Sequence, residues 1–92
     1  MIAEIPSSVL VTITDIANNY KSDFELPSQM LIKDLTMGIL RLLREFEPKK
    51  YAGRTSVDLW VGEKKLKDDQ TLASAGVWDG SEITLHFPGK SI

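Results

Sequence analysis

The spacing of apolar residues changes twice along the chain, and this change restricts the possible folds more than any other feature. Apolar side chains occupy alternate positions near the start, recur at intervals of three and four in the middle, and alternate again in the last third. Alternation is typical of half-buried strands, whereas the wider spacing is typical of an amphipathic helix. The chain is therefore expected to place one helix between two groups of strands.

The first group of strands is predicted to be a hairpin. Its first strand would direct toward the core the alternating β-branched residues Val9, Val11 and Ile13. Asn18 and Asn19 favour a turn, because asparagine tolerates a left-handed backbone. A second strand is expected from Tyr20 to Leu26, with one face formed by Ser22, Phe24 and Leu26.

The middle segment is predicted to form the helix. Its apolar face would hold Ile32, Leu35, Ile39, Leu42, Leu43 and Phe46. Met30 and Leu31 are expected to pack where the helix begins, and Gly38 is expected to let the helix lie close to the sheet. The helix should end just before the proline at residue 48, which disfavours helical geometry in the residue before it, and residues 47–54 should form a loop.

The second group of strands is predicted within residues 57–87. Two strands and a shorter strand at Lys64–Leu66 would turn toward the core the alternating residues Val57, Leu59, Val61, Ile83, Leu85 and Phe87. Between them, Leu72 and Val77 are expected to close the base of the sheet, and Asp79-Gly80 is expected to form a turn. Strands on both sides of a single helix predict an α+β fold.

The composition excludes several classes of function. A chain of 92 residues forms one domain with one modest core. The absence of cysteine rules out disulfides, thiolate catalysis and cysteine-ligated zinc. A formal net charge of -2 gives no bulk attraction to nucleic acid or to anionic membranes. No apolar run approaches the roughly 18 residues of a membrane span, and the first residues lack the features of a signal peptide, so we expect a cytoplasmic protein.

Catalytic chemistry finds no support in the sequence. His86 is the one histidine, and the chain has no zinc-protease, nucleophile-elbow or phosphate-loop motif. Asp68 and Asp69 are adjacent, so in an extended segment their carboxylates would point to opposite faces and would not converge on a metal ion. We therefore expect no enzymatic activity, no cofactor and no metal site.

Residues 59–72, with the sequence LWVGEKKLKDDQTL, resemble the ubiquitin segment that runs through its third strand, its Gly-Lys turn and its Leu-Glu-Asp-Gly-Arg-Thr-Leu stretch. The similarity continues without a gap to Phe87, and it reaches back through Leu26-Pro27-Ser28 and the helix. This resemblance implies a ubiquitin-like β-grasp fold, in which a mixed sheet of four to five strands packs on one helix.

Two further stretches resemble one family among the ubiquitin-like proteins. Residues 31–35 (LIKDL) and 76–85 (GVWDGSEITL) are similar to the YukD/EsaB family of Gram-positive bacteria, whose members are accessory components of type VII secretion systems. The ubiquitin-like domains at the start of mycobacterial secretion-pore subunits are similar too, but those precede membrane spans. The resemblance implies a non-catalytic adaptor that docks on protein partners, namely cytoplasmic parts of the membrane components of such a system.

The ubiquitin-like domain would span residues 9–87, with a flexible N-terminal tail at residues 1–8 and a C-terminal tail at residues 88–92. Ubiquitin and its conjugated relatives end in Gly-Gly, whereas this chain ends in FPGKSI, with one glycine that follows a proline and is not terminal. A covalently conjugated modifier or carrier is therefore the less favoured alternative. A second alternative is a β-grasp domain that forms a homodimer through its exposed sheet face.

Four residues are predicted to form a protein-binding surface on that face. If Leu59 and Leu85 point to the core, their neighbours must point away from it, and these are Asp58, Trp60, Thr84 and His86. The resemblance places Trp60 and His86 at the positions of the isoleucine and the valine of ubiquitin's apolar recognition patch. Alternatively, Trp60 lies flat on the sheet, covered by a loop such as residues 49–54 or by the N-terminal tail. Trp78 is expected to cover the core as a partly buried lid.

Overall fold

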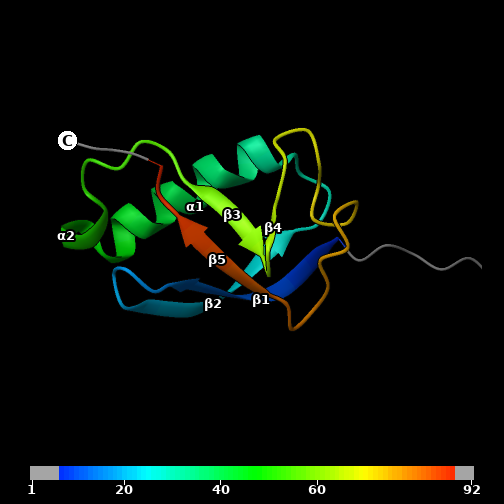
Figure 1. The fold of residues 1–92 in the computed structure, drawn as a ribbon, viewed down its shortest axis with the longest axis horizontal. Helices are drawn as coiled ribbons and strands as arrows, with labels where there is room; N and C mark the ends of the chain where they lie inside the picture. Colours follow the sequence, from blue (N-terminus) through cyan, green and yellow to red (C-terminus); the bar gives the residue numbers. More distant parts are fainter. Residues whose placement is uncertain (1–6, 89–92) are drawn as a thin grey trace, which may run out of the picture.

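The computed structural model describes residues 7–88 (Figure 1). Its elements in chain order are β1 (Ser8–Asp15), β2 (Tyr20–Pro27), α1 (Ile32–Phe46), α2 (Pro48–Tyr51), β3 (Asp58–Val61), β4 (Lys64–Lys65) and β5 (Glu82–His86). The first strand begins at Ser8, one residue before the predicted domain. Most of the two predicted tails, residues 1–6 and 89–92, lies outside the described residues.

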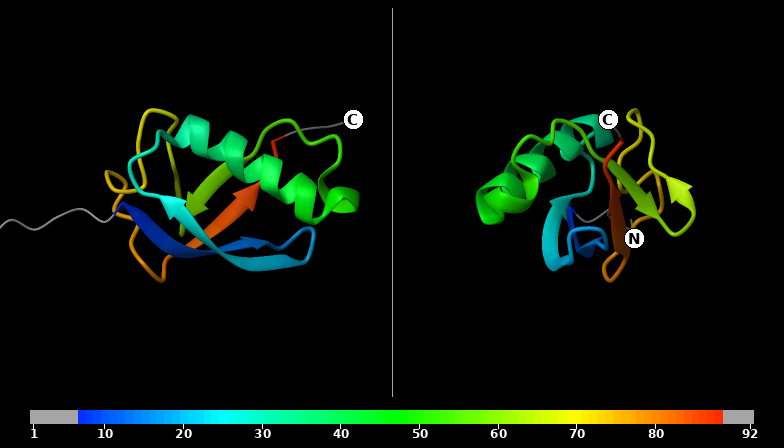
Figure 2. Two further views of the ribbon diagram at one scale, coloured as in Figure 1. Left: turned by 180° about the vertical axis from the view of Figure 1, so that it is seen from behind. Right: turned by 60° about the vertical axis from the view of Figure 1, so that its left-hand side comes forward.

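The strands form one mixed sheet in the order β2-β1-β5-β3-β4. The central strands β1 and β5 are parallel, and every other neighbouring pair is antiparallel. Helix α1 connects the two halves and lies across one face of the sheet (Figure 2). The prediction of an α+β fold, with a mixed sheet of four to five strands on one helix, is confirmed.

The hairpin of β1 and β2 follows the predicted alternation. All eight residues of each strand are paired, from Ser8 opposite Pro27 to Asp15 opposite Tyr20. The inward side chains of the two strands are buried, and these are Val9, Val11, Ile13, Phe24 and Leu26. Asn19 adopts the left-handed backbone conformation that the turn requires, with φ 53°.

The buried face of α1 differs in part from the predicted one. It holds Ile32, Leu35, Ile39, Leu40 and Leu43. The sequence prediction omitted Leu40, which is buried because residues 55–58 pass beside it on the way into β3. Phe46 was expected in the core but remains 58% exposed, because it is the last residue of the helix and its ring meets only the edge of the core at Phe24. Met30 and Leu31, expected to pack where the helix begins, are 42% and 39% exposed and so are covered only in part.

The region between α1 and β3 was predicted as a loop, but it contains the short helix α2. The last residue of that helix, Tyr51, is fully buried, and its hydroxyl donates a hydrogen bond of 2.8 Å to Oδ2 of Asp15. Nδ2 of Asn18 donates to the same oxygen at 2.7 Å. A buried carboxylate is costly unless such donors satisfy it. The Tyr51 bond therefore fastens the segment after α1 to the end of β1, and the Asn18 bond ties the following turn to the same carboxylate.

The base of the sheet is closed as predicted. Leu66, Leu72 and Val77 are buried together with Ile83 and Leu85 of the last strand. The turn before that strand is in place, where Ser81 donates its backbone N–H to the carbonyl of Trp78 at 3.0 Å. Phe87 packs only partly against the core, because β5 ends one residue before it.

Replacing Tyr51 with phenylalanine should lower the free energy of unfolding by about 1–3 kcal/mol, because Asp15 then stays buried with one donor fewer. Urea denaturation measures this loss, and the same change at partly buried Tyr20 is the matched control. An equal, small effect at both positions would contradict the role given to the Tyr51 hydroxyl.

The same site predicts a pH dependence. Burial, with the hydrogen bond and charge of Asp15, raises the pKa of Tyr51 above its ordinary value near 10. The folded state then holds this proton while the unfolded state releases it, so stability should fall as the pH rises above about 10. The difference in unfolding free energy between the wild type and Tyr51→Phe, measured across that range, isolates the effect. A difference that does not change with pH would refute it.

Gly38 was expected to permit close contact between helix and sheet, and this prediction is wrong. A Cβ atom at this position would meet no heavy atom within 4 Å. The change Gly38→Ala should therefore stabilise the protein by about 0.5–1 kcal/mol, through helix propensity alone. Gly76, at φ 78°, is the control, because Gly76→Ala should cost about 1–2 kcal/mol in the left-handed region. Thermal unfolding of the two variants distinguishes these opposite signs.

Candidate protein-binding surface

The four predicted surface residues lie together on the face of the sheet opposite α1. In the antiparallel pairing of β3 with β5, Asp58 is opposite His86 and Trp60 is opposite Thr84. Leu59 and Leu85, which alternate with these residues, are buried in the core. The alternation of the two strands thus places all four side chains on one patch of the outer face.

An aromatic pair forms the centre of this patch. The rings of Trp60 and His86 lie 5.3 Å apart between centroids, with their planes tilted by 54°. Trp60 is half-buried, between the fully exposed and the covered states that the sequence allowed, whereas His86 is exposed. The Nε1 atom of Trp60 is buried and has no hydrogen-bond partner among residues 7–88. Such an unpartnered N–H costs about 1–3 kcal/mol.

Polar side chains surround the aromatic pair. Lys65 of β4, which is opposite Trp60 in the sheet, forms an exposed ion pair of 3.6 Å with Asp58. Exposed pairs of this kind contribute little to stability. Across β1, β2 and β5 the outer face carries hydroxyl–carboxylate hydrogen bonds of 2.7–2.8 Å, formed by Ser8 with Glu25, Thr12 with Asp23, and Thr14 with Glu82. An apolar centre with a polar rim is the usual anatomy of a protein interface.

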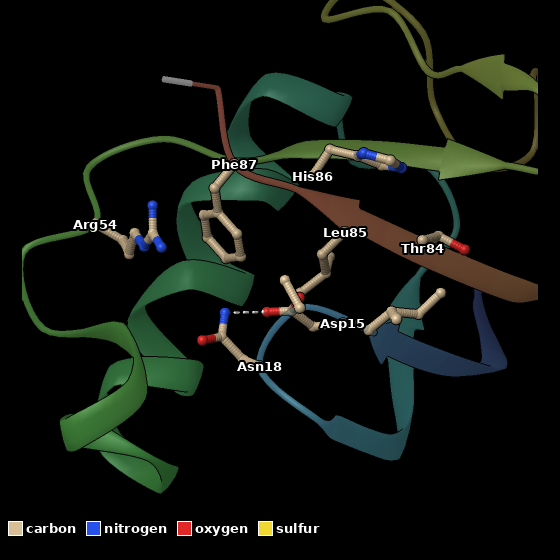
Figure 3. Close-up of a pocket in the computed structure, with 9 residues that line it drawn as sticks. Asp15, Asn18, Arg54, Thr84, Leu85, His86 and Phe87 are labelled. Carbon is tan, nitrogen blue, oxygen red and sulfur yellow. Dashed lines mark hydrogen bonds between the residues drawn. The ribbon is translucent and has the colours of Figure 1, made fainter. Parts of the chain in front are cut away.

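A depression of about 460 Å³ adjoins the patch (Figure 3). It opens where β1 ends at Asp15 while β5 continues to His86. Its wall includes the guanidinium of Arg54, which lies 4.9 Å above the ring centroid of Phe87. The Arg54 carbonyl accepts hydrogen bonds from the side chain of Arg44, which hold this loop in place. Within residues 7–88, no carboxylate lies within ion-pair distance of the Arg54 guanidinium.

Sequence reasoning did not identify Arg54 or Asn18 as lining residues of this depression. Both residues lie in loops. The contact between Asp15 and Tyr51 brings these two loops together, and no local sequence pattern predicts that contact. The prediction that Trp78 covers the core is wrong, since this side chain is 55% exposed. Val77 occupies the buried position in that turn, which leaves the next side chain pointing outward.

In the part of the chain from residue 7 to 88, no group of three or more acidic or histidine side chains could hold a metal ion. No helix in that part is long and apolar enough to cross a membrane.

Comparison with known families decides what kind of chain this is. The family described as "WXG100 protein secretion system (Wss), protein YukD" matches residues 9–85, which is most of the chain. The chain belongs to the YukD family. Among curated proteins, no relative shows significant similarity.

Solved structures place this YukD-family chain among ubiquitin-like domains. The ubiquitin-like domain of the Mycobacterium tuberculosis type VII secretion system protein ECCD1 is 26% identical, with a TM-score of 0.67, over 87% of this chain and 98% of that one. The EccD5 ubiquitin-like domain from Mycobacterium xenopi is 22% identical, with a TM-score of 0.73, over 94% of this chain and 100% of that one. The predicted ubiquitin-like β-grasp fold is confirmed.

A third similar structure belongs to a larger assembly. A chain of the MycP5-free ESX-5 inner membrane complex has a TM-score of 0.75 and 17% identity over 95% of this chain. The present chain covers only 22% of that longer chain. At this identity the similarity shows the fold alone.

The unpartnered N–H of Trp60 predicts a stability effect. The change Trp60→Phe keeps an aromatic ring beside His86 but makes it smaller, which lowers stability. It also removes the unpartnered N–H, which raises stability. The unfolding free energy should therefore stay within about 1 kcal/mol of the wild type. The neighbouring core change Leu59→Ala should cost about 2–5 kcal/mol in the same urea titration. A loss of more than about 2 kcal/mol for Trp60→Phe would show that the indole is part of the core.

Proposed function

We propose that this YukD-family protein is a non-catalytic, cytoplasmic adaptor of a Gram-positive type VII secretion system. It docks through its outer sheet face on a cytoplasmic part of a membrane component of that system. The observation that carries the proposal is the Trp60–His86 pair, which forms an aromatic centre on a face that the helix leaves uncovered. The family match supports the link to a secretion system, and the aromatic pair supports the choice of this face for docking.

The chemistry of the patch suits a protein partner. Tryptophan is among the residues most enriched in binding hot spots, because it contributes a large apolar area at a small cost in conformational entropy. A carbonyl of the partner could accept a hydrogen bond from the Trp60 N–H after a small rotation of the ring, which would recover the cost of leaving it unpartnered. The exposed Asp58–Lys65 pair and the Thr84 hydroxyl would form the rim of the interface.

The secretion-related neighbours support the choice of partner. One similar domain is part of a type VII secretion protein, and one similar chain is part of an inner membrane complex. A chain with the same fold could occupy a comparable place on the cytoplasmic side of such an assembly.

Affinity purification from the native host tests the proposal. The wild type should co-purify secretion-system membrane proteins, and Trp60→Ala should reduce their recovery at least tenfold, because hot-spot truncation costs about 2 kcal/mol or more. Trp78→Ala is the matched control, since it removes an exposed tryptophan outside the patch. Urea denaturation confirms that both variants fold.

Mass spectrometry of the recovered chain distinguishes the remaining alternative. An intact, free Ile92 with co-purified membrane components agrees with an adaptor. An isopeptide bond from a processed tail to a lysine of another protein would instead identify a modifier. Equal recovery of partners by the wild type and Trp60→Ala would refute docking through this face.

A further inference from the structure

Strand β2 is a long free edge of the sheet. Among residues 7–88 it occupies one end of the strand order, and its eight residues pair with β1 alone. The backbone N–H of Ser28 donates to the carbonyl of Ser7, and that of Thr12 donates to the carbonyl of Ser81 on the opposite side of β1. Because bonding groups alternate along antiparallel strands, the odd-numbered residues Lys21, Asp23 and Glu25 turn their N–H and C=O groups to the open side. Edges of this kind readily pair with another strand.

An apolar band runs beside this edge, between β2 and α1. It includes a depression of about 300 Å³ lined by Leu26, Pro27, Met30, Leu35, Gly38, Ile39 and Leu42, with Glu25 and Arg41 at its rim. Exposed Phe46, whose ring lies 6.4 Å from that of Phe24 in β2, adds apolar surface at the end of the helix. The band and the free edge together offer backbone bonds and apolar burial to one occupant.

The charge pattern of β2 identifies that occupant as a second copy of the same strand. We infer that β2 pairs antiparallel with β2 of another molecule, with Asp23 opposite Asp23 on the twofold axis. This register places Lys21 of each copy opposite Glu25 of the other, and it joins residues whose bonding groups face outward. A shift that centres the axis on Phe24 would instead oppose Asp23 and Glu25 twice.

One like-charge contact remains in the favoured register, between the two Asp23 side chains. Each of these carboxylates accepts a hydrogen bond of 2.8 Å from Thr12 of its own β1, which holds it away from the axis. Because this repulsion opposes dimerisation, the fraction of dimer is expected to depend on the protein concentration. Removing this charge with Asp23→Asn should strengthen it several-fold.

The dimer would leave the proposed docking faces free. The β2–β2 pairing joins the two five-stranded sheets edge to edge, and the twofold axis that relates the copies is perpendicular to the sheet. Both α1 helices therefore lie on one side of the joined sheet. Both Trp60–His86 patches then face the opposite side, in the same direction. The inference concerns the β2 edge, which β1 and β5 separate from β3 and Trp60, and it does not rest on the proposed function.

Cysteine cross-linking tests the register directly, because the natural chain contains no cysteine. Asp23→Cys places two sulfurs opposite each other, at the roughly 5.5 Å Cα separation that a disulfide accepts. Under mild oxidation it should form a covalent dimer many-fold faster than Ala52→Cys, an exposed control outside β2. Preferential cross-linking of Thr84→Cys would place the contact on the outer face and overturn the inference.

A charge exchange provides the second test. Lys21→Glu and Glu25→Lys should each weaken self-association roughly tenfold in analytical ultracentrifugation, because each opposes like charges twice. An equal mixture of the two variants restores both opposite-charge contacts and should form a heterodimer. Lys64→Glu, with the same charge change on β4, is the control. A wild type that stays monomeric at millimolar concentration, or a dimer indifferent to Lys21→Glu, would refute the inference.

Discussion

The parallel pairing of β1 with β5 is the constraint on which the rest of the structure depends. Parallel neighbours need a long crossover between them, so α1 must cross one face of the sheet. Ile13 and Ile83, opposite each other in this pair, are fully buried beneath that crossover. With β2 on the other side of β1, β3 and β4 lie beyond β5. This order leaves β2 as a free edge and brings Trp60 next to the outward side chains of β5.

A second interaction determines the shape of the surface near that patch. The hydrogen bond from Tyr51 to Asp15 ties the segment after α1 to the point where β1 leaves the sheet. Tyr20 packs edge-on against the ring of Tyr51, and Phe87 contacts the same ring. These aromatic rings surround the hydrogen bond and exclude water from it. Arg54, three residues later, is thereby held over Phe87 and faces the depression beside His86. A buried polar contact thus positions a surface cation.

The sequence was sufficient to predict the elements in which apolar residues recur at a regular spacing. The alternation of β1, β3 and β5 and the helical spacing of α1 are local, so their inward faces follow directly. Four outward residues of the patch followed from the same alternation, once the resemblance to ubiquitin had set the strand order. Helix α2 has four residues, too few to show a period. Burial of Leu40 and Tyr51 and the placement of Arg54 depend on contacts between distant segments, which no local pattern encodes.

The half-buried state of Trp60 links stability to recognition. A phenylalanine at this position would keep the ring contact with His86 and avoid an unpartnered N–H. Small domains have only about 5–15 kcal/mol of net stability, so a cost of 1–3 kcal/mol is a substantial fraction. Local features that lower stability without an internal compensation are expected at functional sites. In the proposed docking, an acceptor supplied by the partner would compensate this cost.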